Sequence, residues 1–176
     1  MMRELETERL RLRYLTAEDA QTIFDGWASD PEVPKYMTWN AHKDVSETKR
    51  ILDGWLRHYD EPDCFRYGME LKCTGELIGM IDVVGYREGC PVIGYCSGKR
   101  FWGNGYMTEA LNAVSDELFS AGYDTLIVEA VKENTGSNRV IRKCGYELVS
   151  AVTKQLSAIK PEPVTVNSYR KKRTDL

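Results

Sequence analysis

The sequence lacks the features of a membrane or secreted protein. No run approaches the roughly 18 apolar residues of a membrane span, and residues 1–6 contain no apolar segment of the kind found in a secretory signal. The five cysteines are odd in number and form no C-x-x-C pair, so neither a disulfide framework nor a zinc site is indicated. We therefore expect a cytoplasmic protein with reduced thiols, no membrane partner and no metal.

An excess of positive charge is also missing. The chain carries 24 Lys and Arg against 27 Asp and Glu, which gives a net charge of −3 and an isoelectric point near 5.5. Nucleic-acid binders present a strongly basic face, so we expect no nucleic-acid partner. The one basic cluster, at 170–173, is interpreted as a solvated C-terminal tail.

With 42% hydrophobic residues, the chain predicts a single domain over residues 1–176.

The spacing of apolar residues predicts an alternation of strands and helices. Helices are expected after a capping box formed by Thr16 and Asp19, after a cap at Ser46, over 106–121, and from the segment 134–137 to Cys144. Strands are expected at 9–15, 65–71, 76–86, 92–97, 125–131, from 146 onward and at 164–169. This order predicts an α/β architecture, a mixed sheet with helices on its faces.

The most informative stretch is an R-x-x-G-x-G segment at 100–105, between the strand 92–97 and the helix 106–121. Gly103 and Gly105 carry no Cβ, so the backbone can turn tightly and bring its N–H groups close to an oxygen. The free N–H groups and the macrodipole at the helix start favour an anion. The stretch therefore predicts a pyrophosphate site. The alternative is a turn that uses glycine only for its geometry. The spacing fits neither a P-loop nor a dinucleotide-binding fingerprint.

Three motifs together resemble the GCN5-related N-acetyltransferases (GNAT), and within them the RimJ/RimL-like branch related to ribosomal-protein N-terminal acetylases. They are E-R-L-R-L-R at 8–13, I-G-Y at 93–95 followed by F-W-G-N-G-Y-M-T-E-A at 101–110, and N-x-x-S at 134–137 leading to K-C-G-Y at 143–146. The resemblance covers nearly the whole chain. It implies the GNAT fold, a mostly antiparallel mixed sheet of about seven strands flanked by about four helices, with a splay between the fourth and fifth strands.

The resemblance further implies acetyl-CoA as the acetyl donor. The loop 100–105 and the first helical turn would hold its pyrophosphate. The strand 92–97 would diverge from 125–131, leaving a slot for the pantetheine arm and unpaired backbone groups that polarise the acetyl carbonyl. The cofactor-binding residues implied in this way are Tyr95, Cys96, Ser97, Arg100, Gly103, Asn104, Gly105, Tyr106, Met107, Thr108 and Asn134.

Two residues are candidates for catalysis, which requires a neutral amine and a proton donor for the departing thiolate. Glu129 lies on an otherwise apolar strand, and a Glu at this offset before Asn134 is the proposed base in the alanine-N-terminus acetylases that the chain resembles. Burial would raise its pKa towards a useful range. The alternative is a structural carboxylate paired with an Arg.

For the acid, a Ser three residues after the Asn is the proposed donor in RimL-like enzymes, and Ser137 holds that position. The alternative is that Ser137 is the N-cap of the helix that follows. The Tyr that many GNAT enzymes use as acid, seven residues past the Asn, is replaced here by Ile141. The Cys96 thiol is interpreted as core packing and not as the site of an acetyl-enzyme.

We therefore expect an N-acetyltransferase that acts by direct attack of a primary amine in a ternary complex, with a protein or peptide N-terminal α-amine as acceptor. A small-molecule amine, such as an antibiotic, a polyamine or an amino acid, is an alternative, because the segments that select the acceptor are the least readable. A non-catalytic CoA-binding module is a further alternative. A homodimer is left open.

Overall fold

The centre of the molecule is an eight-stranded sheet with the strand order β1-β2-β3-β4-β5-β6-β8-β7. The computed structural model describes residues 3–174. Neighbouring strands are antiparallel except β5 and β6, which are parallel. The strands are β1 (Leu5–Glu6), β2 (Leu10–Arg13), β3 (Arg66–Leu71), β4 (Leu77–Arg87), β5 (Cys90–Ser97), β6 (Thr125–Val131), β7 (Glu147–Lys154) and β8 (Val164–Lys172).

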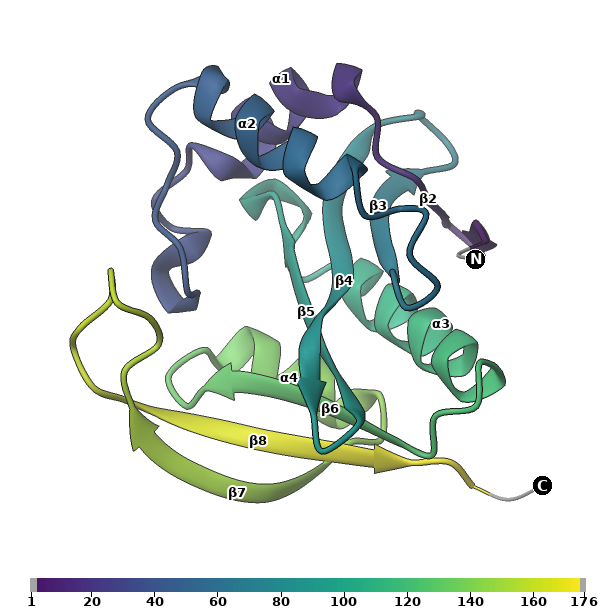
Figure 1. The fold of residues 1–176 in the computed structure, drawn as a ribbon, viewed down its shortest axis with the longest axis vertical. Helices are drawn as coiled ribbons and strands as arrows, with labels where there is room; N and C mark the ends of the chain where they lie inside the picture. Colours follow the sequence, from purple (N-terminus) through teal and green to yellow (C-terminus); the bar gives the residue numbers. More distant parts are fainter. Residues whose placement is uncertain (1–2, 175–176) are drawn as a thin grey trace.

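Four α-helices flank this sheet within the described chain: α1 (Ala20–Ile23), α2 (Val45–Leu56), α3 (Tyr106–Ser120) and α4 (Thr135–Lys143). A 3₁₀ turn (Ala17–Asp19) and a π-helical turn (Phe24–Ala28) extend α1 at its two ends. Figure 1 places α1 and α2 together at one end of the molecule and the β7–β8 pair at the other. The predicted mixed α/β fold is confirmed, with one strand more than expected.

Two apolar clusters lie on opposite faces of the sheet. The larger joins α3 and α4 to the strands through residues such as Leu111, Ile141 and Ile93. The smaller joins α1 and α2 to the other face through Ile23, Leu52 and Met80. Because successive residues of a strand point to opposite faces, these clusters show which helices each side chain of β4, β5 or β6 faces.

The helix starts follow local hydrogen bonding. The capping box at Thr16 is confirmed, since the Asp19 carboxylate accepts from the Thr16 N–H at 2.8 Å. The predicted cap at Ser46 is wrong. Asp44 begins α2, because its Oδ1 accepts from the backbone N–H groups of Ser46 and Glu47 at 2.9 and 3.1 Å. A carboxylate at this place also meets the positive end of the helix dipole.

The predicted splay lies between β5 and β6. The two strands pair at only two positions in the described sheet, Val92 with Ile127 and Ile93 with Val128. Beyond them β5 continues to Ser97 on the side of β4, and β6 continues to Val131 on the side of β8. Backbone groups of both strands therefore face a gap where a regular sheet would pair them.

Candidate functional site

The glycine turn that follows β5 has the backbone geometry predicted for an anion site. Gly103 and Gly105 have φ angles of +77° and +82°, in the left-handed region that favours glycine. Gly105 is the N-cap of α3 and has no side chain to occupy the first N–H groups of the helix. Those groups carry the positive partial charge of the helix terminus. The turn thus ends at a helix start that can receive an oxyanion.

Side chains in the turn brace it from within. The Asn104 amide donates to the carbonyl groups of Phe101 and Trp102 at 3.1 and 3.2 Å. The Trp102 indole N–H donates to the Ser97 carbonyl at 2.9 Å, which ties the turn to the end of β5. The Arg100 guanidinium is paired with Glu76. The cation expected at the anion site is therefore held by a carboxylate of the neighbouring β-hairpin.

The first turn of α3 supplies three more of the predicted residues. Tyr106, Met107 and Thr108 are all half-buried, and Tyr106 and Met107 pack against the larger apolar cluster. The Thr108 carbonyl accepts from the Cys144 thiol at 3.4 Å, which links α3 to the end of α4. What this turn offers to a ligand is its backbone N–H groups.

Tyr95 and Ser137 meet on the α3–α4 side of the splay. The Tyr95 hydroxyl lies 2.8 Å from Ser137 Oγ. The alternative of Ser137 as an N-cap is wrong, because Asn134 caps α4 by accepting from the Ser137 N–H at 3.2 Å. This leaves the Ser137 hydroxyl free to pair with Tyr95. Burial raises the pKa of Tyr95, so its phenol stays protonated at neutral pH.

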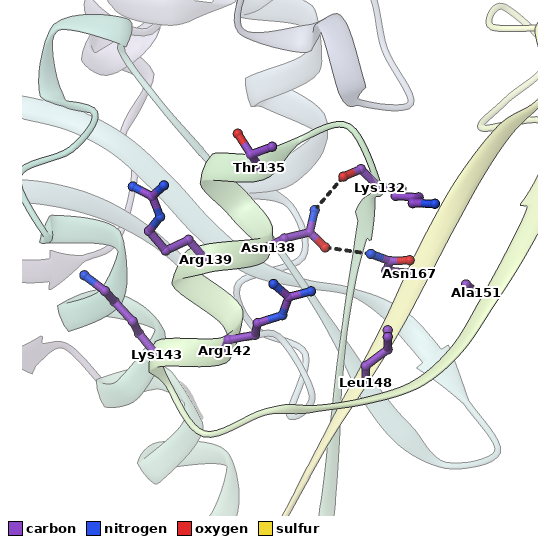
Figure 2. A pocket seen from close by; sticks show the side chains of 9 residues that line it. All are labelled: Lys132, Thr135, Asn138, Arg139, Arg142, Lys143, Leu148, Ala151 and Asn167. Atoms are coloured by element: carbon purple, nitrogen blue, oxygen red, sulfur yellow. Dashed lines mark hydrogen bonds between the residues drawn. The ribbon is translucent and has the colours of Figure 1, made fainter.

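Asn138 holds this part of α4 in place (Figure 2). Its Nδ2 donates to the carbonyl groups of Asn134 and Val131 at 2.7 and 2.9 Å. Its Oδ1 accepts from Asn167 Nδ2 at 2.9 Å and from the Tyr169 hydroxyl at 2.6 Å. The start of α4 is thus fastened to both β6 and β8, and this fixes the position of Ser137. Basic side chains such as Arg139 and Arg142 line an open groove beside it.

Cys96 and Ser97 are the last two residues of β5, and their contacts are those of packing and strand pairing. The Cys96 side chain packs against the smaller apolar cluster, and burial raises the pKa of its thiol to about 12. The thiol is therefore neutral at physiological pH, which agrees with core packing. Ser97 pairs in register with Gly79 of β4.

Glu129 carries two cationic partners. Its Oε1 accepts from Arg87 Nη1 at 2.7 Å and its Oε2 from Lys154 Nζ at 3.3 Å. Burial alone would raise the pKa of Glu129, but the Arg87 hydrogen bond and the charges of Lys154 and Arg87 outweigh it and leave the pKa below its ordinary value. The expected rise of this pKa is therefore wrong, and the arginine partner considered as the alternative is present.

Asp82 is a carboxylate in the same region that the sequence analysis missed. It lies on β4 opposite Gly94, one residue past the last pairing of β5 with β6. Arg66 Nε donates to it at 2.9 Å, yet burial keeps the pKa of Asp82 above its ordinary value. The signal that singled out Glu129, one carboxylate in an apolar strand, is also present in the run 77–84.

The two kinds of candidate lie on opposite faces of the sheet. Ile93 and Val128 are paired and belong to the α3–α4 cluster, so Glu129, the next residue along β6, faces the α1–α2 side. Tyr95 instead packs with the α3–α4 cluster. The splay therefore has a hydroxyl pair on one face and a carboxylate on the other. A group passing through it would lie between these hydroxyls and this carboxylate.

Two loops meet on the α1–α2 side, beyond the splay. Lys160 Nζ, in the β7–β8 connection, donates to the Pro34 carbonyl at 2.8 Å. Trp39 lies in the same loop as Pro34, and its partly buried ring packs against the smaller apolar cluster. Residues 3–174 contain no helix long and apolar enough to cross a membrane, and no group of three His, Cys, Asp or Glu arranged for a metal.

The chain was compared with known proteins. A family model described as an acetyltransferase (GNAT) domain matches residues 9–147. The "Uncharacterized N-acetyltransferase p20" of Bacillus licheniformis is 32% identical over 149 residues, which cover 83% of each chain.

Solved structures extend the likeness over almost the whole chain. RimL, a ribosomal L7/L12 α-N-protein acetyltransferase in complex with coenzyme A, superposes with a TM-score of 0.84 at 18% identity, covering 97% of this chain and 98% of that one. MccE, a microcin C7 self-immunity acetyltransferase in complex with acetyl-CoA and AMP, gives a TM-score of 0.84 at 19% identity, covering 95% and 94%. At these identities the likeness concerns the fold.

The glycine turn, the splay and α4 all fall within the matched region, whereas β8, which helps to fasten α4, lies beyond it. The family model spans most of the chain, and the p20 relative matches it over 83% of its length. The chain belongs to the GNAT family of N-acetyltransferases.

Proposed function

We propose that this enzyme holds acetyl-CoA in the splay between β5 and β6 and transfers its acetyl group to a primary amine by direct attack in a ternary complex. The observation that carries the proposal is the two-position pairing of β5 with β6 together with the left-handed turn at Gly103 and Gly105 beyond the end of β5. The unpaired backbone groups of the two strands can hydrogen-bond to an amide-containing arm such as pantetheine. A helix start whose N–H groups are not taken by a capping side chain can bind a pyrophosphate. Acetyl-CoA, when bound, supplies an activated acyl thioester.

The chain's own residues would bind and move protons around that group. Backbone N–H groups at 103–108 would hold the phosphates, with Asn134 orienting the loop ahead of α4. Backbone groups at 94–97 would align the arm and polarise the carbonyl. The Tyr95–Ser137 pair would donate a proton on the α3–α4 side, since its two hydroxyls are hydrogen-bonded and the phenol is protonated.

Glu129 would receive the proton of the amine on the opposite face. It is ionised at neutral pH because Arg87 and Lys154 lower its pKa, so the base form is present under those conditions. Asp82 is the second carboxylate on this face and carries a raised pKa. The two carboxylates are distinguished by measuring transfer in Glu129→Gln and in Asp82→Asn separately. The variant that loses transfer identifies the base.

The acceptor we favour is the N-terminal α-amine of a peptide or protein. An α-amine has a pKa of about 8, so a usable fraction is neutral at physiological pH without a strong base. This suits a carboxylate of lowered pKa. RimL, whose fold is similar, acts on a protein α-amine according to its description. MccE has an equally similar fold and a microcin immunity role, so small-molecule amines are the second candidate.

A panel assay tests this proposal. Acetyl-CoA is offered with peptides that have a free N-terminus and no lysine, with the same peptides blocked at the N-terminus, and with polyamines, amino acids and aminoglycosides. Products are identified by mass. Acetylation of free N-termini but not of blocked peptides supports the proposed acceptor. Transfer only to small amines supports the second candidate. Binding of acetyl-CoA without any transfer would contradict the enzyme proposal and indicate a binding module.

A further inference from the structure

Arg9, which lies just before β2, reaches the start of α3. Its Nε donates to Glu109 Oε2 at 2.8 Å, and its backbone N–H donates to Glu109 Oε1 at the same distance. Its Nη1 donates to the Asn104 carbonyl at 3.0 Å, inside the glycine turn. The guanidinium carbon lies 4.5 Å above the centre of the Tyr106 ring. The Arg9 side chain thus contacts the glycine turn, the first residue of α3 and Glu109 in the first turn of that helix.

The turn between β1 and β2 is folded around the same carboxylate. The Thr7 hydroxyl donates to Glu109 Oε1 and accepts from the Leu10 N–H. The Thr7 N–H in turn donates to the Leu10 carbonyl at 2.9 Å. The segment 7–10 and the first turn of α3 therefore form one hydrogen-bonded unit. This connects the first and second of the three motifs on which the family resemblance depends.

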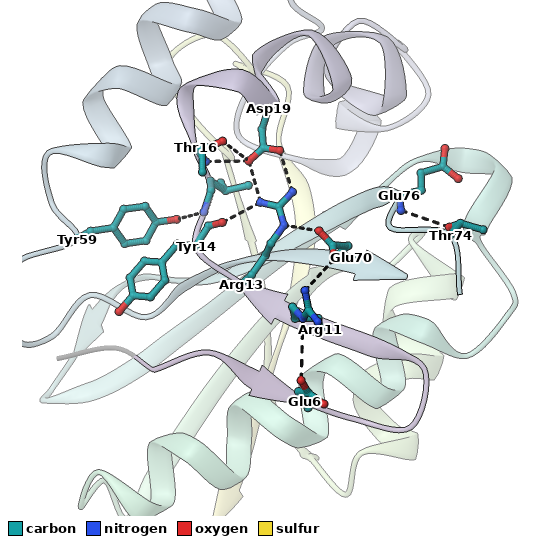
Figure 3. Close-up of polar contacts among 11 residues, drawn as sticks. Glu6, Arg11, Arg13, Tyr14, Thr16, Asp19, Tyr59, Glu70, Thr74 and Glu76 are labelled. Carbon is teal, nitrogen blue, oxygen red and sulfur yellow. Dashed lines mark hydrogen bonds and ion pairs between the residues drawn. The ribbon is translucent and has the colours of Figure 1, made fainter. Parts of the chain in front are cut away.

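The other two arginines of the first motif, Arg11 and Arg13, form ion pairs with carboxylates away from the glycine turn (Figure 3). Arg13 pairs with Asp19 at 2.9 Å and with Glu70 at 2.6 Å, and so fastens β2 to β3 and to the turn ahead of α1. Arg11 lies 3.6 Å from Glu70. Of these three arginines, Arg9 is the one directed at the glycine turn.

The ion pair between Arg9 and Glu109 matters for anion binding because Glu109 is negatively charged. The carboxylate lies in the first turns of α3, close to the N–H groups that would receive the pyrophosphate. An unpaired negative charge there would repel an anionic ligand. Arg9 offsets that charge, and its Nη2 lies 3.4 Å from the position that a Cβ on Gly105 would occupy. A second cation thus stands at the turn, where Arg100 is paired with Glu76.

We propose that Arg9 is a positioning residue for acetyl-CoA, which holds the glycine turn through Asn104 and neutralises Glu109. The inference rests on the proposed placement of acetyl-CoA at this turn. It goes beyond the glycine turn itself, because it assigns the affinity for the cofactor partly to the first motif of the chain.

The test compares Arg9→Gln with Arg3→Gln. Arg3 pairs with Glu117 of the same helix α3 through contacts of 2.6 to 3.1 Å, but far from the turn. Acetyl-CoA binding is measured by calorimetry, and steady-state rates are measured with the best amine of the panel. Arg9→Gln is expected to raise the Kd and KM for acetyl-CoA about tenfold or more, with little change in kcat or in the KM for the amine. Arg3→Gln is expected to leave all four unchanged.

Two more variants keep the proposal falsifiable if Arg9→Gln folds poorly. Arg9→Lys retains the charge but not the planar fork that spans Asn104 and Glu109, so it is expected to recover part of the affinity. The double variant Arg9→Gln/Glu109→Gln is expected to bind no more weakly than Arg9→Gln, because the two residues act as a unit.

Unchanged acetyl-CoA affinity in Arg9→Gln or Arg9→Lys, with the wild type binding normally, would overturn this inference alone. A loss of kcat without a change in the KM for acetyl-CoA would also overturn it. A wild-type protein that does not bind acetyl-CoA would overturn the proposed function as well. These results are distinguishable because the wild type is measured in the same series.

Discussion

The Tyr95 hydroxyl and Ser137 Oγ lie 2.8 Å apart and join β5 to α4 beside the splay. Ser137 is not the N-cap of α4, so its hydroxyl is not used for capping. Asn134 takes that role, accepting from the Ser137 N–H with its side chain. The pair places two hydroxyl groups in series next to the gap between the strands, on the side of α3 and α4.

The first prediction concerns this pair. Ser137→Ala and Tyr95→Phe are each expected to lower kcat about 10²-fold, the lower end of the usual contribution of a general acid. The KM for acetyl-CoA should change little, because the turn and the strand backbone are intact. Steady-state kinetics with the best amine acceptor measures both quantities.

A second tyrosine–serine pair provides the control. The Tyr146 hydroxyl lies 2.7 Å from Ser115 Oγ, buried between α3 and the start of β7. Tyr146→Phe should lower the free energy of unfolding by about 1 kcal/mol and leave kcat within about twofold, since this pair lies between α3 and the start of β7 and not beside the splay. Equal losses of kcat in Tyr95→Phe and Tyr146→Phe would show that the first pair is only structural.

The second prediction concerns Glu129 and pH. Because Arg87 and Lys154 hold its pKa below the ordinary value, Glu129 is ionised throughout the neutral range. The acid limb of kcat/KM should therefore follow the pKa of the amine, near 8 for a peptide α-amine and higher for an alkyl amine. Glu129→Gln should lower kcat/KM about 10²-fold. An acid limb near pH 6 that is the same for all amines and disappears in Glu129→Gln would contradict the lowered pKa.

Glu70→Gln is the matched control for Glu129→Gln. Glu70 is also paired with two cations, Arg13 and Arg11, at a similar exposure of 16% against 21%, but on β3 away from the splay. Glu70→Gln should leave kcat/KM within about twofold, as expected for a residue outside the site.

Glu129 also predicts a dependence of stability on pH. Since the folded pKa of Glu129 is lowered, its contribution to stability is present at neutral pH and is lost as the pH falls through that pKa. Urea unfolding at pH 7 and at acid pH measures this loss.

The third prediction concerns Cys96. The Cys96 side chain is half-buried and its thiol has a pKa raised to about 12 by desolvation, whereas Cys73 is exposed. Brief treatment of the native enzyme with N-ethylmaleimide at pH 7 should therefore label Cys73 and spare Cys96, because the thiolate is the reactive form. Cys96→Ala should retain transfer. An acetyl group found on Cys96 by mass spectrometry after incubation with acetyl-CoA alone would contradict direct attack.

Elements whose signals are local could be predicted from the sequence. The strand Thr125–Val131 was predicted with its observed bounds, because an apolar run between polar residues marks it. The helix α3 begins at the predicted Tyr106 and ends within a residue of the expected end, since a glycine stands beyond each end. The splay was predicted from the family resemblance and not from any periodicity.

What the sequence did not reveal depends on contacts between distant segments. The strand β1 has two residues, too few for a period, and is recognised only by its pairing with β2. The cap at Asn134 and the pKa of Glu129 depend on which partners the fold brings near. The link from Arg9 to Glu109 spans 100 positions. No local pattern encodes that distance.

The most direct test of the account is the affinity for acetyl-CoA of the wild type, Gly103→Ala and Gly75→Ala. Both glycines have positive φ, +77° and +71°, and an added Cβ would meet nothing within 4 Å at either position. Each variant should therefore lose about 1–2 kcal/mol of stability from backbone strain alone. Gly75 lies in the β3–β4 hairpin, and Gly103 lies in the proposed phosphate site.

By calorimetry, we predict that the wild type and Gly75→Ala bind acetyl-CoA with equal affinity and that Gly103→Ala binds about tenfold more weakly or not at all, because the phosphate oxygens need close approach to the turn backbone. Equal affinity in all three proteins, or no binding by the wild type, would contradict the placement of acetyl-CoA at the start of α3.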